Sequence, residues 1–257
     1  RTMSHAMNTS RVYSVAVAMA ACLLCLGSAE AKKPDHPGGG GELQLVELLP
    51  APVGDDYYLA HDINDAGIVV GGSNLVAGTW DATAAAPTFS PLQGGRGVAN
   101  AINNADEIVG WSPTGPRYWA NPSADPIDLP LPEGFTKGRA NAISSDGVVV
   151  GEISGGNEYS AAAWRVNNGS VFGPVVLSVG GAHDVATLEA GTNRVVGRSA
   201  DSVFGHVATA WDLEIDSDFC FTVTGLTNLA PGHSAEAYAI TDAGDLTGII
   251  KWGGGID

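Results

Sequence analysis

A short phrase recurs along the chain, and it limits the possible folds more than any other feature of the sequence. Its clearest copies read AHDINDAGIVVGGS, ANAINNADEIVGWS, ANAISSDGVVVGEIS and AYAITDAGDLTG. Each copy places alanine three residues before an isoleucine and glycine eight residues after it; the isoleucines are Ile63, Ile102, Ile143 and Ile240. Two short apolar runs around a polar, turn-forming centre predict a β-hairpin.

The centre of each copy has the composition of a tight turn. One residue after the isoleucine stands Asn64, Asn103, Ser144 or Thr241. Such side chains can hydrogen-bond the turn backbone. Four residues after the isoleucine stands Gly67, Asp106, Gly147 or Gly244. These residue types tolerate a positive φ, so we expect a type I turn closed by a bulge. The second strand is then expected to end at Gly71, Gly110, Gly151 or Gly248.

A fifth copy contains an insertion in its turn. Ala182-His183-Asp184-Val185 matches the start of the first copy, and a longer turn leads to Val195-Val196-Gly197. Either Val185 or Leu188 can take the place of the isoleucine; the first choice keeps the alanine in register.

Two further elements recur between the hairpins, so each unit contains about four short strands. One is an Ala-x-x-Trp strand, found at 77–80, 161–164 and 208–211, and at 116–119 with proline in place of alanine. The other is a leucine strand that runs into a Pro or Gly turn, found at 43–49, 89–92, 127–131, 175–179 and 222–229.

The spacing of the repeats predicts the architecture. The glycines at 71, 110, 151, 197 and 248 lie 39 to 51 residues apart, a period typical of β-propeller blades. Runs such as Val148-Val149-Val150 are apolar on both faces, as expected of a sheet covered on both sides. We therefore expect an all-β fold, an incomplete β-propeller of about five four-stranded blades over residues 43–257 that forms part of a larger ring.

These motifs resemble those of a known family. The order Ala-x-x-Ile-Asn-x-x-Gly-x-Val-Val-Gly, then Ala-x-x-Trp, then a leucine strand is similar to the HAF family of extracellular repeats in bacterial secreted proteins. The resemblance covers residues 43 to about 252, although the family's His-Ala-Phe triplet is reduced here to its alanine (Ala77, Ala161, Ala208). It implies export and a propeller-like repeat, and it implies no particular activity, substrate or catalytic residue.

The N-terminal part has the pattern of an export signal. Arg11 is followed by an apolar stretch over 12–26 and by Ala29-Glu30-Ala31, which fits a small-x-small cleavage site. Residues 1–31 are interpreted as an upstream extension and a signal peptide, with a lipoprotein signal ending at Cys22 as the alternative. Residues 32–42, rich in glycine and proline, are expected to form a flexible linker. The repeat domain then spans 43–257 and is expected to be truncated at its C-terminus.

Charge and cysteine content exclude several classes of function. The formal net charge is −16, which disfavours binding to nucleic acid or to anionic membrane surfaces. After removal of the signal only Cys220 of the three cysteines remains, so the chain can form neither an internal disulfide nor a zinc site built on cysteines. No cofactor motif is found, no metal site is assigned, and no membrane insertion is expected after signal cleavage.

Candidate binding residues follow the repeat. Two positions before the isoleucine, or before Val185 in the fifth copy, the residue is polar or aromatic: His61, Asn100, Asn141, His183 and Tyr238. If the first hairpin strand is innermost, these residues form a ring at one mouth of an axial channel, where propellers hold ligands. The alternative is that they make hydrogen bonds between blades. The neighbouring pairs His61-Asp62 and His183-Asp184 are not expected to act as dyads, because adjacent strand residues point to opposite faces.

Two other groups of residues are candidate sites. Asp212, Glu214, Asp216 and Asp218 alternate with Leu213, Ile215, Ser217 and Phe219, so they form either a solvated strand face or a cation site. The four repeat tryptophans are expected in the core between blades, which leaves Trp111 as the better candidate for an exposed aromatic residue.

The sequence thus predicts a secreted, periplasmic or extracellular repeat protein that acts as a binding or structural module. Its partner would be an unidentified glycan or protein. The alternative is a propeller-fold enzyme acting on glycans, a hydrolase or lyase; such an enzyme should have polar residues that break the repeat and converge at one mouth. No catalytic residue is assigned.

Overall fold

The computed structural model describes residues 46–48, 58–73, 75–156, 158–167, 169–187, 193–203, 205–215, 221–241 and 243–251. The predicted signal peptide and linker lie outside this part, as do most of the first leucine strand, Asp216, Asp218 and Cys220. Every regular element in the described part is a β-strand, which confirms the all-β prediction. None of the described residues belongs to a helix of the length and hydrophobicity needed to cross a membrane.

The strands form five successive antiparallel units, in which each strand pairs with its neighbours in sequence. Unit 1 contains β1 (Tyr58–Ile63), β2 (Ile68–Ser73), β3 (Val76–Asp81) and β4 (Ser90–Arg96). Unit 2 contains β5 (Val98–Ile102), β6 (Ile108–Ser112), β7 (Gly115–Trp119) and β8 (Ile127–Asp128). Unit 3 contains β9 (Lys137–Ile143), β10 (Val148–Gly155), β11 (Glu158–Asn167) and the first part of β12 (Ser170–Thr187). Unit 4 contains the second part of β12, β13 (Asn193–Asp201), β14 (Gly205–Ile215) and β15 (Phe221–Asn228), and unit 5 contains β16 (Ser234–Ile240) and β17 (Leu246–Lys251).

Strand β12 belongs to two units. It pairs with β11 up to Val179 and with β13 from Gly180 onward. Gly180 has a φ of 142°, which glycine adopts easily, so the strand can turn from one sheet into the next at this residue. The leucine strand of unit 3 therefore runs directly into the first hairpin strand of unit 4.

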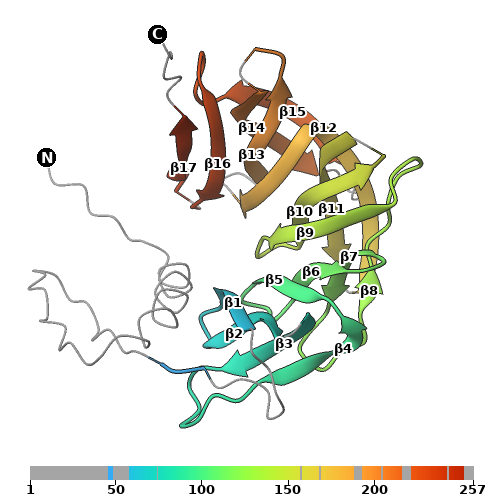
Figure 1. Ribbon diagram of the computed structural model, residues 1–257, viewed down its shortest axis with the longest axis vertical. Coiled ribbons are helices and arrows are strands. Elements are labelled where there is room, and N and C mark those ends of the chain that lie inside the picture. Colours follow the sequence, from blue (N-terminus) through green and yellow to red (C-terminus); the bar gives the residue numbers. More distant parts are fainter. Residues whose placement is uncertain are drawn as a thin grey trace, which may run out of the picture.

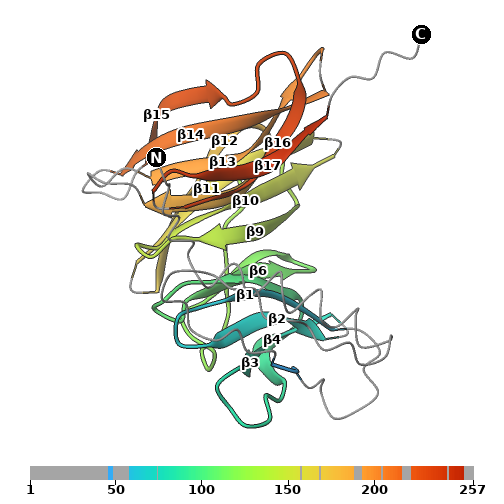
Figure 2. The same cartoon turned by 90° about the vertical axis from the view of Figure 1, so that its left-hand side faces the viewer.

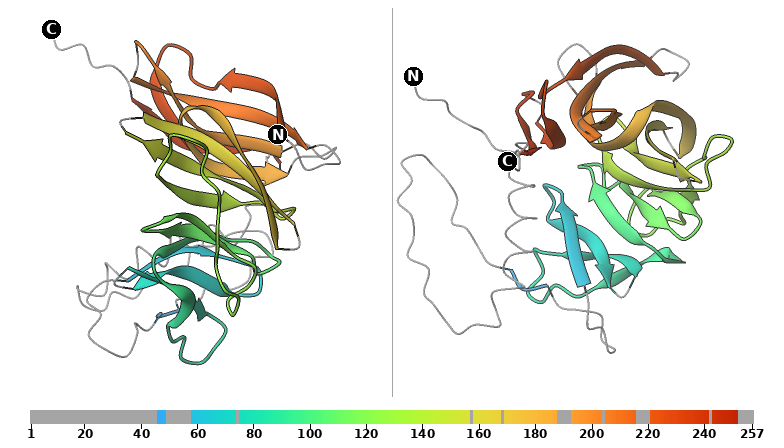
Figure 3. Two further views of the ribbon diagram at one scale, coloured as in Figure 1. Left: turned by 90° about the vertical axis from the view of Figure 1, so that its right-hand side faces the viewer. Right: turned by 45° about the horizontal axis from the view of Figure 1, so that its top comes forward.

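The units follow one another round an arc that does not close within the described residues (Figures 1 and 3). In the first four units the first strand lies on the inner side of the arc, and β4, β8 and β15 lie on the outer side (Figure 1). The side view shows the sheets as successive layers (Figure 2). Neighbouring units touch through their hairpins, for example β2 against β5 and β6 against β9.

The predicted turns are confirmed. Gly67 N donates to Asn64 O at 3.0 Å, and the same bond recurs at the other uninterrupted hairpins. The φ angles are 80° at Gly67, 63° at Asp106, 84° at Gly147 and 83° at Gly244. The side chain that opens each turn also accepts a backbone N–H, as in Ile68 N to Asn64 Oδ1 at 3.0 Å. Asn103, Ser144 and Thr241 accept equivalent bonds.

The second strand does not end at its glycine, so that prediction was wrong. β2 continues to Ser73 and β10 to Gly155. Space is the reason for the glycine: a Cβ on Gly71, Gly110, Gly151 or Gly248 would lie only 1.9–2.2 Å from a carbonyl oxygen of the first strand. A side chain at this position would overlap the backbone of the partner strand.

Three of the four repeat tryptophans, Trp119, Trp164 and Trp211, lie in the cores between units, as predicted, and Trp80 lies in the core of unit 1 with Leu48. Trp80, Trp119, Trp164 and Trp211 are all at most 1 % exposed. Trp119 packs with Leu92 of unit 1 and donates its indole N–H to Gln93 O at 3.0 Å. Trp164 repeats this arrangement with Leu129 and Pro130 O at 2.8 Å. Trp119 and Trp164 therefore each join their own unit to the leucine strand of the unit before it.

Candidate functional site

All five predicted binding residues occupy one structural position, the extra residue of a β-bulge. In β1 the pairing passes from Ala60↔Gly71 to Asp62↔Val70, so His61 has no residue of its own opposite it. The same shift occurs at the other four positions: Asn100, Asn141, His183 and Tyr238. The fifth hairpin thus uses the register in which Val185 takes the place of the isoleucine. Bulges bend a strand and change the direction of a side chain.

The bulge invalidates one argument made from the sequence. Strict alternation of side chains, which excluded a His61-Asp62 dyad, does not hold where an extra residue is inserted. Asp62 nevertheless serves the contact between units: its Oδ1 accepts the N–H of Ile63 at 2.9 Å and its Oδ2 accepts the N–H of Ile102 at 3.0 Å. Asn100 makes a comparable contact, since its Nδ2 donates to Ala140 O of the next unit at 2.7 Å.

The other bulge residues differ in exposure. His61 and Tyr238 are exposed, and Asn141 is half-buried. Surrounding protein partly desolvates the His61 ring, and this lowers its pKa below the usual 6.5. The side chain of His183 lies outside the described residues. The structure therefore shows one shared backbone position for the five, and a contact between units for Asn100.

A second set of positions varies from unit to unit. Each hairpin has a cross-strand pair next to its repeated alanine–glycine pair, on the side away from the turn, and the residues of this pair differ between units. These rim pairs are Leu59↔Gly72, Val98↔Trp111, Arg139↔Glu152, Gly181↔Arg198 and Glu236↔Ile249. They are apolar in units 1 and 2 and carry charge in units 3 to 5.

The charged rim pairs are connected across three units. Arg139 Nη2 lies 2.8 Å from Glu152 Oε1 within unit 3. Arg198 of unit 4 lies between two carboxylates, with Nη2 3.7 Å from Glu152 Oε2 and Nη1 3.3 Å from Glu236 Oε1. The hydroxyl of the bulge residue Tyr238 donates to Glu236 Oε2 at 3.1 Å. Desolvation of the hydroxyl by the surrounding protein and the nearby Glu236 carboxylate raise the pKa of Tyr238.

This chain of charges is incompletely satisfied. Glu152 Oε2 and Arg198 Nε are buried and have no hydrogen-bond partner among the described residues. The Glu152 side chain is only 10 % exposed, and 3.7 Å is too long for a hydrogen bond to Arg198. Gly181 leaves the space between them open, because a Cβ there would lie 3.0 Å from Glu152 Oε2. Buried polar atoms are costly unless they are paired, so these two atoms suit a polar ligand or an ordered water.

The apolar rim pairs adjoin the charged ones. Leu59 is exposed, and Val98 and Trp111 are half-buried. Strand β6, which carries Trp111, contacts β9, which carries Arg139. Trp111 of unit 2 therefore lies in the unit next to that of Arg139 and Glu152. Its indole is half-buried and so less exposed than expected.

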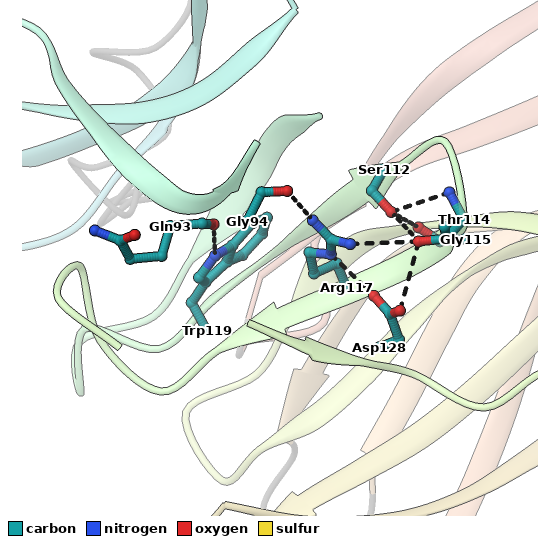
Figure 4. Close-up of polar contacts among 8 residues, drawn as sticks. All are labelled: Gln93, Gly94, Ser112, Thr114, Gly115, Arg117, Trp119 and Asp128. Carbon is teal, nitrogen blue, oxygen red and sulfur yellow. Dashed lines mark hydrogen bonds and ion pairs between the residues drawn. The ribbon is translucent and has the colours of Figure 1, made fainter. Parts of the chain in front are cut away.

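A different arginine shows what a purely structural cluster looks like. Arg117 is 9 % exposed and lies where units 1 and 2 meet (Figure 4). Its Nε donates to Asp128 Oδ1 at 2.9 Å, its Nη1 to Gly94 O at 2.8 Å and its Nη2 to Thr114 Oγ1 at 3.3 Å (Figure 4). Each of its three nitrogens has a partner inside the protein. Arg117 therefore joins two units and presents no group to a ligand.

The row of carboxylates on β14 and beyond is only partly described. Asp212 accepts a bond from Arg194 Nε at 2.6 Å, so its charge is already compensated by a neighbour. Glu214 is exposed, and Asp216 and Asp218 lie outside the described residues. Within the described part of the chain no three His, Cys, Asp or Glu side chains are grouped as metal ligands.

Sequence reasoning missed the charged rim pairs. The signal was present: the residue before the repeated alanine and the residue after the repeated glycine are charged only in the later copies. Their convergence depends on the strand register, because the bulge sets which residues stand opposite each other.

Comparisons of the chain with protein-family models, with curated proteins and with solved structures give no match.

Proposed function

We propose that the protein is a secreted, extracellular repeat protein of the propeller type that acts as a binding module through its rim pairs. The observation that carries the proposal is the departure of the rim pairs from the repeat: charged side chains of units 3 to 5 converge, and two of their buried atoms have no hydrogen-bond partner among the described residues. The export pattern and the resemblance to HAF repeats support a location outside the cytoplasm.

A glycan is the ligand class that this chemistry fits best. Glu152 and Arg198 offer an acceptor and a donor for hydroxyl groups, and Trp111 in a neighbouring unit offers an aromatic face for a sugar ring. Binding sites commonly combine apolar surface with a few placed polar groups. The formal net charge of −16 favours neutral or basic glycans over strongly acidic ones.

The test is a glycan and peptide array screened with the full chain and with three variants. Glu152→Gln and Trp111→Ala change the rim pairs. Asp212→Asn makes the same carboxylate-to-amide change in the ion pair with Arg194, outside the rim pairs. We expect the wild type and Asp212→Asn to bind the same glycans, and the other two variants to lose at least about tenfold in affinity. Equal binding by all four proteins, or binding to peptides only, would contradict the proposal.

A glycan-active enzyme is the second candidate, and one observation favours it. Arg198 holds the carboxylates of Glu152 and Glu236 on either side of one guanidinium, and pairs of carboxylates hydrolyse glycosidic bonds. Turnover of the bound glycans separates the two functions. A hydrolase should release product and lose that activity in Glu152→Gln, whereas a binding module should leave every bound glycan intact.

A further inference from the structure

Gly181 stands at a rim position where the other units carry a side chain. Its equivalents in the first hairpin strands are Leu59, Val98, Arg139 and Glu236. Gly181 is not among the glycines with a positive φ, and the three atoms nearest to an added Cβ all belong to the side chains of Glu152 and Arg198. Neither the backbone conformation nor the backbone of the partner strand therefore requires glycine here. The missing side chain leaves open the space between Glu152 and Arg198.

One acceptor and one donor border this space. Glu152 Oε2 and Arg198 Nε are both buried and have no hydrogen-bond partner among the described residues. Arg198 Nη2 lies 3.7 Å from Glu152 Oε2. Since two nitrogens of one guanidinium are about 2.3 Å apart, Nε is at most about 6 Å from Oε2, and a single oxygen can lie about 3 Å from both. The Arg198 side chain is 26 % exposed, so the space adjoins the surface beside the guanidinium.

The charges around the space favour a neutral group. Arg139 Nη2 lies 2.8 Å from Glu152 Oε1. Arg198 Nη1 lies 3.3 Å from Glu236 Oε1, so two positive and two negative groups already balance. An ammonium group in the space would lie against Arg198 and a carboxylate would lie against Glu152, and like charges at this distance repel. A hydroxyl group can donate to Glu152 Oε2 and accept from Arg198 Nε at the same time.

Tyr159 brings an aromatic ring to the same face of unit 3. In the regular pairing of β10 with β11, Glu152 stands opposite Ala161 and Ser154 stands opposite Tyr159. Residues two apart on a strand, and residues directly opposite each other, point to one face of the sheet. Glu152 and Tyr159 are therefore diagonal neighbours, about 7–8 Å apart and within reach of long side chains. Tyr159 is 54 % exposed, so its ring is free to cover the apolar face of a sugar.

We infer that the space over Gly181 is a subsite for one hydroxyl group of a neutral sugar, held between Glu152 Oε2 and Arg198 Nε, with Tyr159 as the platform for the sugar ring. The inference rests on the proposed function, since it specifies which group of the glycan the rim pairs recognise. Gly181 then determines specificity, because its lack of a side chain admits the hydroxyl. An ordered water also donates and accepts, so the test separates a sugar hydroxyl from water.

The test follows the Arg198 Nε–H signal in NMR spectra of the isotope-labelled full chain, assigned by its loss in Arg198→Lys. The probes are the methyl glycosides of glucose, galactose and mannose, and their forms with one hydroxyl replaced by hydrogen or by an amino group. We expect at least one parent glycoside to shift the signal. For one of its hydroxyls, both the deoxy and the amino form should bind at least about tenfold more weakly.

Two sets of variants test the residues. Gly181→Ala should lose at least about tenfold in affinity for that glycoside, because its methyl group takes the place of the hydroxyl. Gly72→Ala is the matched control and should bind as the wild type does: Gly72 is the rim-pair glycine of unit 1, also lacks a positive φ, and its added Cβ would meet Val76 and Val98. Tyr159→Ala should weaken binding, and Tyr159→Phe should not. Circular dichroism checks that each variant folds, and the deoxy probes decide on the wild type alone if Gly181→Ala does not.

Several results would overturn the inference. An Arg198 signal that no glycoside moves would show that the space holds water only. Equal binding by Gly181→Ala and the wild type would remove the role of Gly181, equal binding by Tyr159→Ala would remove the platform, and tighter binding of an amino form would assign the space to a cation. Glycan binding on the array with an unmoved Arg198 signal would leave the proposed function standing without this inference. An array that binds no glycan would remove the proposed function, and the inference with it.

Discussion

Replacing Gly110 by alanine should strongly destabilise the protein, although alanine is normally the better residue inside a strand. The new Cβ would lie 2.0 Å from Val98 O and 2.9 Å from the Cα of Ala99. Ordinary contact begins at 3.4 Å, so the shortfall at the oxygen is about 1.4 Å. Both obstacles are backbone atoms of β5, and neither can rotate away.

The loss in the free energy of unfolding follows from the displacement of β5 that this overlap requires. A shift of β5 by this distance would break the hydrogen bonds on either side of the bulge at Asn100. Losing two such bonds and leaving their buried groups unpaired amounts to about 3–5 kcal/mol. Unfolding in urea, followed by circular dichroism, measures this loss as a lower midpoint with an unchanged slope.

Gly232→Ala is the matched control for this change. Gly232 has a φ of 81°, and no atom of the described residues lies within 4 Å of an added Cβ, so alanine there adds only conformational strain of roughly 1–2 kcal/mol. If Gly110→Ala were no more destabilising than this control, the explanation of the repeated glycines by close approach would be wrong.

Three further predictions concern stability. Asn103→Ala should cost about 2–3 kcal/mol in urea unfolding, because this buried side chain bonds its own turn and Ser144 O of the next unit. Thr241→Ala, which removes the acceptor of the Asp245 N–H within its own turn, should cost less than about 1 kcal/mol. Trp164→Phe should cost about 1 kcal/mol more than Trp211→Phe in thermal unfolding, since Trp164 donates an indole hydrogen bond and Trp211 Nε1 has no partner among the described residues; equal costs would contradict this. Because the fold lowers the pKa of His61, the unfolded chain binds its proton more tightly, so the stability that neutral His61 contributes is complete above about pH 6.5 and is lost as the pH falls below it. His61→Gln should therefore reduce the loss of stability between about pH 8 and about pH 5, measured by the urea midpoint at each pH.

Much of the fold could be predicted because its determinants are local. The turn residues Asn64 and Gly67 lie next to each other in sequence, and their hydrogen bonds and positive φ follow from residue type. The tryptophans could be assigned to the core because a large apolar side chain at one fixed repeat position must face a neighbour in every copy. The closure of a propeller ring depends on the rotation between units, which no local pattern encodes.

The candidate site could not be predicted to the same degree. His61 and its equivalents were found by their place in the repeat, but their position as bulge residues depends on how two strands align. The approach of Glu152, Arg198 and Glu236, from three different units, depends on the packing of one unit against the next.

The sequence by itself determined the hairpins, their turns, the period of the repeat and the residues of the core, because each depends on neighbours within a few residues or on one apolar position repeated in every unit. Only the tertiary structure decided which strand residues stand opposite each other, why the second strand needs a glycine, and which charges meet. A single extra residue in the first strand changes the alignment of everything beyond it, and its effect appears only when the partner strand is in place.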